Sequence, residues 1–170
     1  MTPERIEPPT IAGERTALEG FLDYQRSTLA MKCAGLDDAR LREASVPPSQ
    51  LTLLGLVRHM ADVERHWFRR ILAGETAAAP IFYSDEDLDG DFRTSEQDTA
   101  EDAFSVWQAE IAAAREAAGG RSLDDVSVGM RANGERFDLR WILLHMIEEY
   151  ARHNGHADLI RERIDGATGE

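Results

Sequence analysis

Residues 138–164 carry an apolar stripe that repeats every three or four positions, the periodicity of an α-helix with one buried face. Projected at 100° per residue, seven side chains fall within an arc of roughly 80°. They are Ile142, Met146, Glu149, His153, Ala157, Ile160 and Ile164. Asp138 is a favourable N-cap and Gly166 a favourable C-terminal stop. A long helix with one buried face is therefore predicted, and it needs partner helices.

Three other segments supply such partners, with apolar residues spaced for one helical face: residues 13–34, 51–72 and 95–119. The third is expected to start near Ser95, because Thr94 and Gln97 have capping-box spacing. A short helix over residues 38–44 is also expected. Four long helices with sizeable connections predict an all-α fold, an antiparallel four-helix bundle.

The connection before the last helix contains Asn133-Gly134, a pair that favours a tight hairpin turn. Weak alternation on both sides allows a short β-hairpin over residues 126–137. The chain of 170 residues fits a single domain spanning 1–170, with an extended arm over 1–12 and an acidic loop over 75–94.

Acidic residues outnumber basic ones 32 to 19, for a net charge of -13. Such a surface repels phosphate backbones, so nucleic acid and anionic membranes are not expected partners. No apolar run approaches the ~20 residues of a membrane helix and no secretion signal is evident, so a cytoplasmic location is expected. Cys33 is the single cysteine, which excludes an intrachain disulfide.

The apolar stripe of the last helix is interrupted in its middle by Glu149 and His153, which are four residues apart on one face. A carboxylate in a core-facing stripe is costly unless its charge is compensated. A metal ion could compensate it, and so could a buried ion pair with His153; the stripe could also face solvent here. A mononuclear site needs another ligand, and the remaining histidines are His59, His66, His145 and His156. Periodicity does not choose between His59 and His66.

Two segments together resemble a known family. Residues 53–68, LLGLVRHMADVERHWF, resemble the second helix of the DinB-like superfamily. Residues 143–159, LLHMIEEYARHNGHADL, resemble its later ligand helix. The closest branch is the mini-circle protein group, common in actinobacteria, and the resemblance covers about residues 15–166.

The resemblance implies a four-helix bundle with one divalent metal near one end, zinc or nickel. His59 matches the first ligand of the family and His153 the last. Glu149 takes the place of a histidine, as in the similar mycothiol-dependent maleylpyruvate isomerase branch. His59, Glu149 and His153 are thus the implied metal ligands. Asp62 and His156 are candidates for groups that support them or face the substrate.

The activity implied by the resemblance is transfer of a low-molecular-weight thiol, such as mycothiol as co-substrate, to an electrophile by a metal-dependent S-transferase. Two alternatives stay open: a hydrolase that uses metal-bound water, and a non-catalytic stress-response or binding protein with a vestigial site. A homodimer formed through a helical face is compatible with this fold.

The acidic loop also matches an EF-hand calcium pattern, D-x-D-x-D-G-x-x-x-x-x-E, over residues 85–96. Its candidate calcium ligands are Asp85, Asp87, Asp89 and Glu96. An EF-hand requires an entering helix, whereas residues 79–84 have an extended pattern. A solvated acidic loop that caps the third helix is the alternative interpretation.

Overall fold

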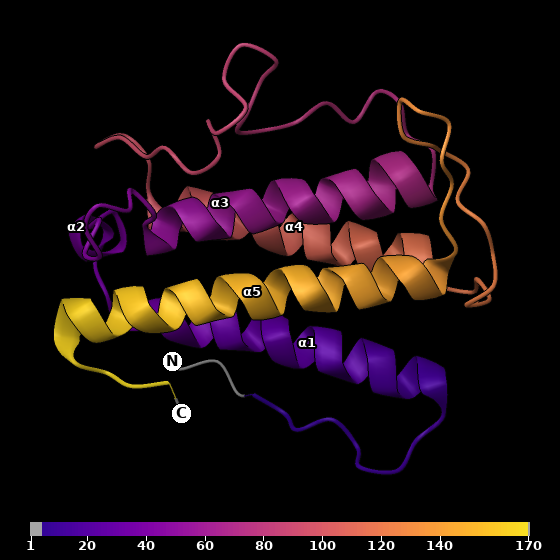
Figure 1. The fold of residues 1–170 in the computed structure, drawn as a ribbon, viewed down its shortest axis with the longest axis horizontal. Helices are drawn as coiled ribbons and strands as arrows, with labels where there is room; N and C mark the ends of the chain where they lie inside the picture. The colour runs from indigo at the N-terminus through magenta and orange to yellow at the C-terminus, as the bar shows by residue number, and fades with distance from the viewer. Residues whose placement is uncertain (1–4, 170) are drawn as a thin grey trace.

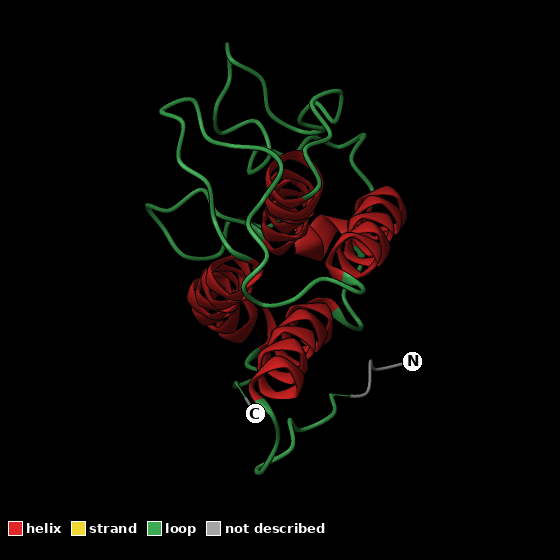
Figure 2. Ribbon diagram, turned by 90° about the vertical axis from the view of Figure 1, so that its right-hand side faces the viewer, coloured by secondary structure: helices red, strands yellow, loops and turns green. Residues whose placement is uncertain are grey.

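The computed structural model describes residues 5–169, which form a bundle of helices with long loops (Figures 1 and 2). In chain order the elements are α1 (Glu14–Cys33), α2 (Asp38–Leu41), α3 (Leu53–Glu64), η1 (Arg65–Leu72), α4 (Ala100–Ala118) and α5 (Leu139–Asp165). The predicted all-α bundle is confirmed. No helix in the described part is both long enough and apolar enough to cross a membrane.

The antiparallel relation holds between two pairs of helices: α1 and α5 run one way, and α3 and α4 run the other (Figure 1). Hydrogen bonds at the ends show these directions. Arg140 at the start of α5 pairs with Glu14 at the start of α1. Arg15 near the start of α1 donates to the Ala118 carbonyl at the end of α4. The parallel pair of α3 and α4 is therefore joined by a long connection, residues 73–99, which runs outside the bundle (Figure 1).

Side-chain caps explain where most helices begin. The Thr52 hydroxyl accepts the Gly55 N–H, and the Asp138 carboxylate accepts the Trp141 N–H, as expected for α5. The prediction that the third helix starts near Ser95 is wrong by about one turn: α4 begins at Ala100, with Thr99 as its cap. The Asp98 carboxylate accepts the N–H and the hydroxyl of Ser95, so a separate turn precedes the helix.

The connection from α4 to α5 contains the predicted turn but no strands among the described residues. The Gly134 backbone is left-handed, with φ 84°, and Arg131 N–H donates to the Glu135 carbonyl. Val128 and Gly129 turn away from a hairpin partner and instead donate their N–H groups to the Leu72 and Ile71 carbonyls. The end of η1 therefore takes two of the N–H groups of the predicted hairpin, while Ser127 N–H still donates to the Phe137 carbonyl.

Residues 5–12 are the described part of the predicted arm. Residues 5–13 are not helical, and Pro8 and Pro9 lie against Gly20 of α1. The remainder of the arm, residues 1–4, lies outside the described residues.

Four buried polar side chains, one from each long helix, form a network in the core. Trp107 Nε1–H donates to Tyr150 Oη (2.8 Å), and the Tyr150 hydroxyl donates to Glu64 Oε1 (2.7 Å). Arg26 donates to both oxygens of Glu64, at 2.8 and 2.7 Å. These bonds satisfy a carboxylate that is 0% exposed. The network thus links all four helices by charge-assisted hydrogen bonds.

Candidate metal centre

One histidine of α3 and two residues of α5 converge between these helices. One ligand atom each from His59, Glu149 and His153 lies within 4.8 Å of the other two. The His59 and His153 ring centroids are 4.6 Å apart, and His153 Nε2 lies 3.5 Å from Glu149 Oε2. Two imidazoles and one carboxylate form a donor set that suits zinc and related divalent metals.

His59 is held in place by the acidic loop. Its Nδ1 lies 2.7 Å from Asp91 Oδ2, and its ring stacks on Phe92 with centroids 4.2 Å apart. The loop reaches α3 at Gly55, where an added Cβ would lie 2.5 Å from the Phe92 carbonyl oxygen. With Nδ1–H donated to Asp91, Nε2 of His59 is free to bind a metal.

Asp91 is 4% exposed, and the sequence did not single it out as a partner of a histidine. Asp62 was the expected supporting carboxylate, but its two oxygens accept the N–H groups of Ile81 (2.7 Å) and Phe82 (2.9 Å). Burial raises the pKa of Asp62, partly offset by these two hydrogen bonds. Asp62 therefore anchors the loop, and Asp91 holds the His59 ring. The only signal for Asp91 was its place in the acidic motif.

His156, the other residue expected to support the ligands or face the substrate, contacts His153. The two Nδ1 atoms are 3.3 Å apart, so one ring can donate to the other. Burial, followed by repulsion from the His59 and His156 rings when they carry a proton, lowers the pKa of His153 to about 3. The ring is therefore neutral at pH 7 and keeps a lone pair for a metal.

Within residues 5–169, Glu149 has no arginine or lysine at bonding distance. The closest arginine nitrogen, Nη1 of Arg152, is 3.9 Å from Oε1, and His145 Nε2 is 3.6 Å from the same oxygen. The Glu149 side chain is only 16% exposed. A largely buried carboxylate surrounded by imidazoles is what a bound divalent cation would stabilise.

A second group of potential ligands shares Glu149 with the first. It joins His145 and Glu148 to Glu149, again with one atom each within 4.8 Å. The Glu148 side chain is 50% exposed and pairs with Arg152, so a cation is already present there. The His59 cluster is the better candidate because it joins two helices and is more buried.

His66, which periodicity did not separate from His59, belongs to neither group. It lies in η1, where Ala73 N–H bonds the Phe68 carbonyl five residues earlier. This π-helical stretch turns less per residue than an α-helix, so a wheel drawn at 100° per residue misplaces the side chains after Arg65.

The four candidate calcium ligands of the acidic loop do not meet at one point. No three acidic side chains of residues 85–96 have oxygens within 4.8 Å of one another, and residues 73–84, which lead into the loop, are not helical. Asp87 pairs with Arg93 instead, and Asp89 lies 4.0 Å from the same arginine. The contacts seen in this loop hold Asp91 against His59 and do not form a calcium cage.

The geometry agrees with a comparison against known families. Residues 17–166 match the family model described as mycothiol-S-transferase, which confirms the relation indicated by the two helical motifs. A search of curated proteins finds no significant match. Because the matched region covers nearly the whole chain, including all three clustered residues, the protein belongs to the mycothiol-S-transferase family.

Proposed function

We propose that the protein is a metal-dependent S-transferase that joins a low-molecular-weight thiol of the mycothiol type to a small electrophile. The observation that carries this proposal is the cluster of His59, Glu149 and His153 in a chain of this family. Two neutral imidazoles and one carboxylate would leave a divalent ion with net charge +1 and open coordination positions. Zinc and nickel both accept this donor set.

A divalent cation held there would lower the pKa of a bound thiol and so supply a thiolate nucleophile at neutral pH. The side chains of the protein have separate tasks. Asp91 orients His59 and keeps its Nε2 free, while His156 contacts the Nδ1 of His153. Transfer forms a carbon–sulfur bond, the leaving group departs with its electron pair, and the thiol proton passes to solvent.

Cys33 is not the nucleophile in this proposal. Its side chain is buried in the core, and burial raises the pKa of the Cys33 thiol to about 12. A thiol with that pKa is almost entirely protonated at pH 7 and cannot reach a substrate in solvent. The attacking sulfur must therefore come from a small molecule.

The decisive experiment is metal content per chain, measured on protein purified without a histidine tag. We expect about one transition metal per wild-type chain, and loss of that metal in Glu149→Ala and His153→Ala. Glu148→Ala is the matched control, because it removes the neighbouring exposed carboxylate. A wild type without metal that also refuses zinc and nickel would overturn the proposal.

Thiol dependence then separates S-transfer from hydrolysis. The loaded enzyme is incubated with an electrophile, with and without added thiol, and thioether formation is measured. Product that requires thiol supports S-transfer. Turnover without thiol supports metal-bound water as the nucleophile.

A further inference from the structure

A second potential site lies at the end of η1, apart from the metal cluster. It is a cavity of about 570 Å³ between η1 and the loop over residues 128–132. Arg70, Arg131 and His66 line it, together with apolar side chains that include Ile71 and Met130, and none of its lining residues is acidic. In a chain of net charge -13, a cavity with two arginines and no carboxylate is a local exception.

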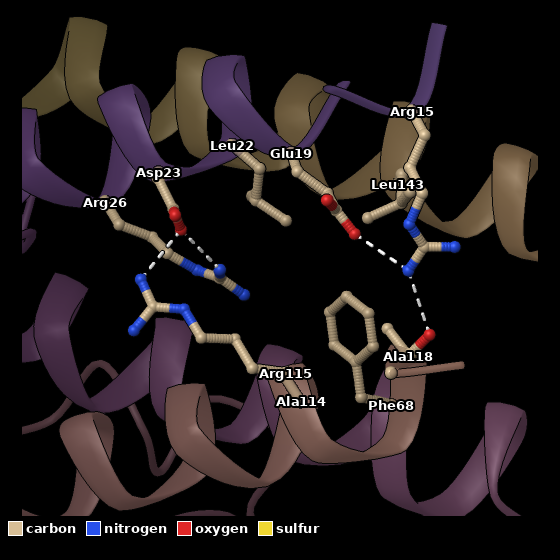
Figure 3. A pocket seen from close by; sticks show the side chains of 11 residues that line it. Arg15, Glu19, Leu22, Asp23, Arg26, Phe68, Ala114, Arg115, Ala118 and Leu143 are labelled. Carbon is tan, nitrogen blue, oxygen red and sulfur yellow. Dashed lines mark hydrogen bonds and ion pairs between the residues drawn. The ribbon is translucent and has the colours of Figure 1, made fainter. Parts of the chain in front are cut away.

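Arg70 supplies an uncompensated positive charge. Within residues 5–169 its guanidinium makes no hydrogen bond and no ion pair, whereas most arginines of the bundle interior are paired. The groove between α1 and α4 shows the contrast (Figure 3). There Arg26 and Arg115 both pair with Asp23, and Arg15 pairs with Glu19, so each of the three arginines of the groove has a carboxylate partner.

The Arg131 guanidinium lies close to three aromatic rings. Its Cζ lies 5.1, 4.8 and 5.8 Å from the ring centroids of Trp67, Phe137 and Trp141. Its carboxylate contact is a surface pair with Glu135 at 3.5 Å, which is worth little. The aromatic rings fix the guanidinium in the cavity wall and leave most of its donors available.

His66 is the third polar group of this cavity. Its Nδ1 is buried and has no hydrogen-bond partner. Burial, followed by the charges of Arg70 and Arg131, lowers the pKa of His66 to about 4. Both arginines thus create a positive potential at the cavity, and the neutral imidazole adds no charge of its own.

The wall of the cavity is firmly attached to the bundle. Val128 and Gly129 donate to the carbonyls at the end of η1, at 3.0 and 2.8 Å. A Cβ on Gly129 would lie 2.2 Å from the Arg70 carbonyl oxygen, so only glycine permits this contact. The two arginines therefore face a preformed space, which lowers the entropic cost of binding.

We propose that this cavity binds the oxyanion of a small organic acid, a carboxylate or a phosphoryl group, with its apolar part against Ile71 and Met130. Guanidinium groups bind such oxyanions through charge-assisted hydrogen bonds. The proposal depends on Arg70 and Arg131 and not on a metal. Its test is therefore independent of the test of the proposed S-transfer.

The test is a titration of metal-free protein with three probes of similar size: benzoate, phenyl phosphate and the neutral benzamide. Trp67 and Trp141 contact Arg131, so tryptophan fluorescence reports binding, and calorimetry checks it. We expect saturable binding of one or both anions and a much weaker response to benzamide. The preferred anion distinguishes a carboxylate ligand from a phosphoryl ligand.

Variants localise the binding. Arg70→Gln is expected to weaken the anion about ten- to a hundredfold, because one charge-assisted contact is lost. Since Arg70 has no partner, this change should leave folding intact. Arg93→Gln is the matched control, an exposed arginine that pairs with Asp87. Absence of saturable anion binding, equal binding of benzamide, unchanged binding in Arg70→Gln, or an equal loss in Arg93→Gln would each overturn the proposal.

Discussion

Glu64 and Glu149 are both withdrawn from solvent in this bundle, and their surroundings differ. Glu64 is met by two donors of Arg26 and by the Tyr150 hydroxyl. Glu149 is met by His145 and His153, at 3.6 and 3.5 Å, and by no arginine closer than 3.9 Å. Within the described residues, Glu64 has both hydrogen-bond donors and a paired cation, whereas Glu149 has no arginine or lysine at bonding distance. The comparison separates a carboxylate that holds the fold from one that is available to a metal.

The largest effect is expected when the buried ion pair between Arg26 and Glu64 is removed. Burial opposes the charge of Arg26, yet Glu64 outweighs it and raises the pKa of the guanidinium above its ordinary value. Arg26→Met leaves Glu64 buried without a cation, and we expect a loss of about 3–5 kcal/mol in the free energy of unfolding. Unfolding by denaturant, in buffer that contains a metal chelator, measures this loss.

The matched control for that variant is Arg115→Met. Arg115 pairs with the same Asp23 at the same 2.9 Å, but its side chain is 59% exposed. Its replacement should change the free energy of unfolding by less than about 0.5 kcal/mol. Equal losses in the two variants would contradict a special role for the buried pair.

The second-largest effect is expected when metal is added, because Glu149 is the carboxylate without a paired arginine. At a free zinc concentration 100 times its Kd, wild type should gain about 2.7 kcal/mol of stability. In Glu149→Gln most of that gain should disappear, whereas the stability without metal should stay equal or rise, because a carboxylate without a cation has been removed. Thermal unfolding with zinc and with chelator measures both. A large loss of metal-free stability in Glu149→Gln would show that Glu149, like Glu64, holds the fold.

A smaller effect, on zinc affinity, is expected when Asp91, the carboxylate that contacts His59, is replaced. Asp91→Asn should weaken zinc binding about tenfold, because the amide no longer accepts the Nδ1–H of His59 as strongly. Competition with a chromogenic chelator measures the affinity. Asp62→Asn, which alters the anchor of the same loop, should reduce it less; the reverse order would make Asp62 the supporting group.

The smallest effect concerns Cys33. Cys33→Ala should leave zinc affinity within about twofold, since a free buried cysteine acts as a small apolar side chain. In the native protein at pH 8, alkylation of Cys33 should be far slower than in urea, because burial raises its pKa to about 12. Rapid alkylation of the folded protein would show that this thiol is reachable.

Local pattern was enough for the helices and for part of the site. Spacing placed Glu149 and His153 on the buried face of α5, because helical periodicity depends only on neighbours along the chain. The caps at Asp138 and Gly166 were also readable, and Gly166 indeed has a left-handed backbone, with φ 80°. The start of α4 could not be read from the sequence, because Asp98 and Ser95 form a competing turn that capping-box spacing does not reveal.

The sequence by itself determined an all-α bundle and an inward-facing Glu149–His153 pair, because both follow from the 3.6-residue repeat of one helix. Family resemblance added His59. Only the tertiary structure decided that Asp91 contacts His59, that Arg26 pairs with Glu64, and that Arg70 has no partner within residues 5–169. Each of these depends on which segments meet across tens of residues, and that is determined by how the helices and loops pack together.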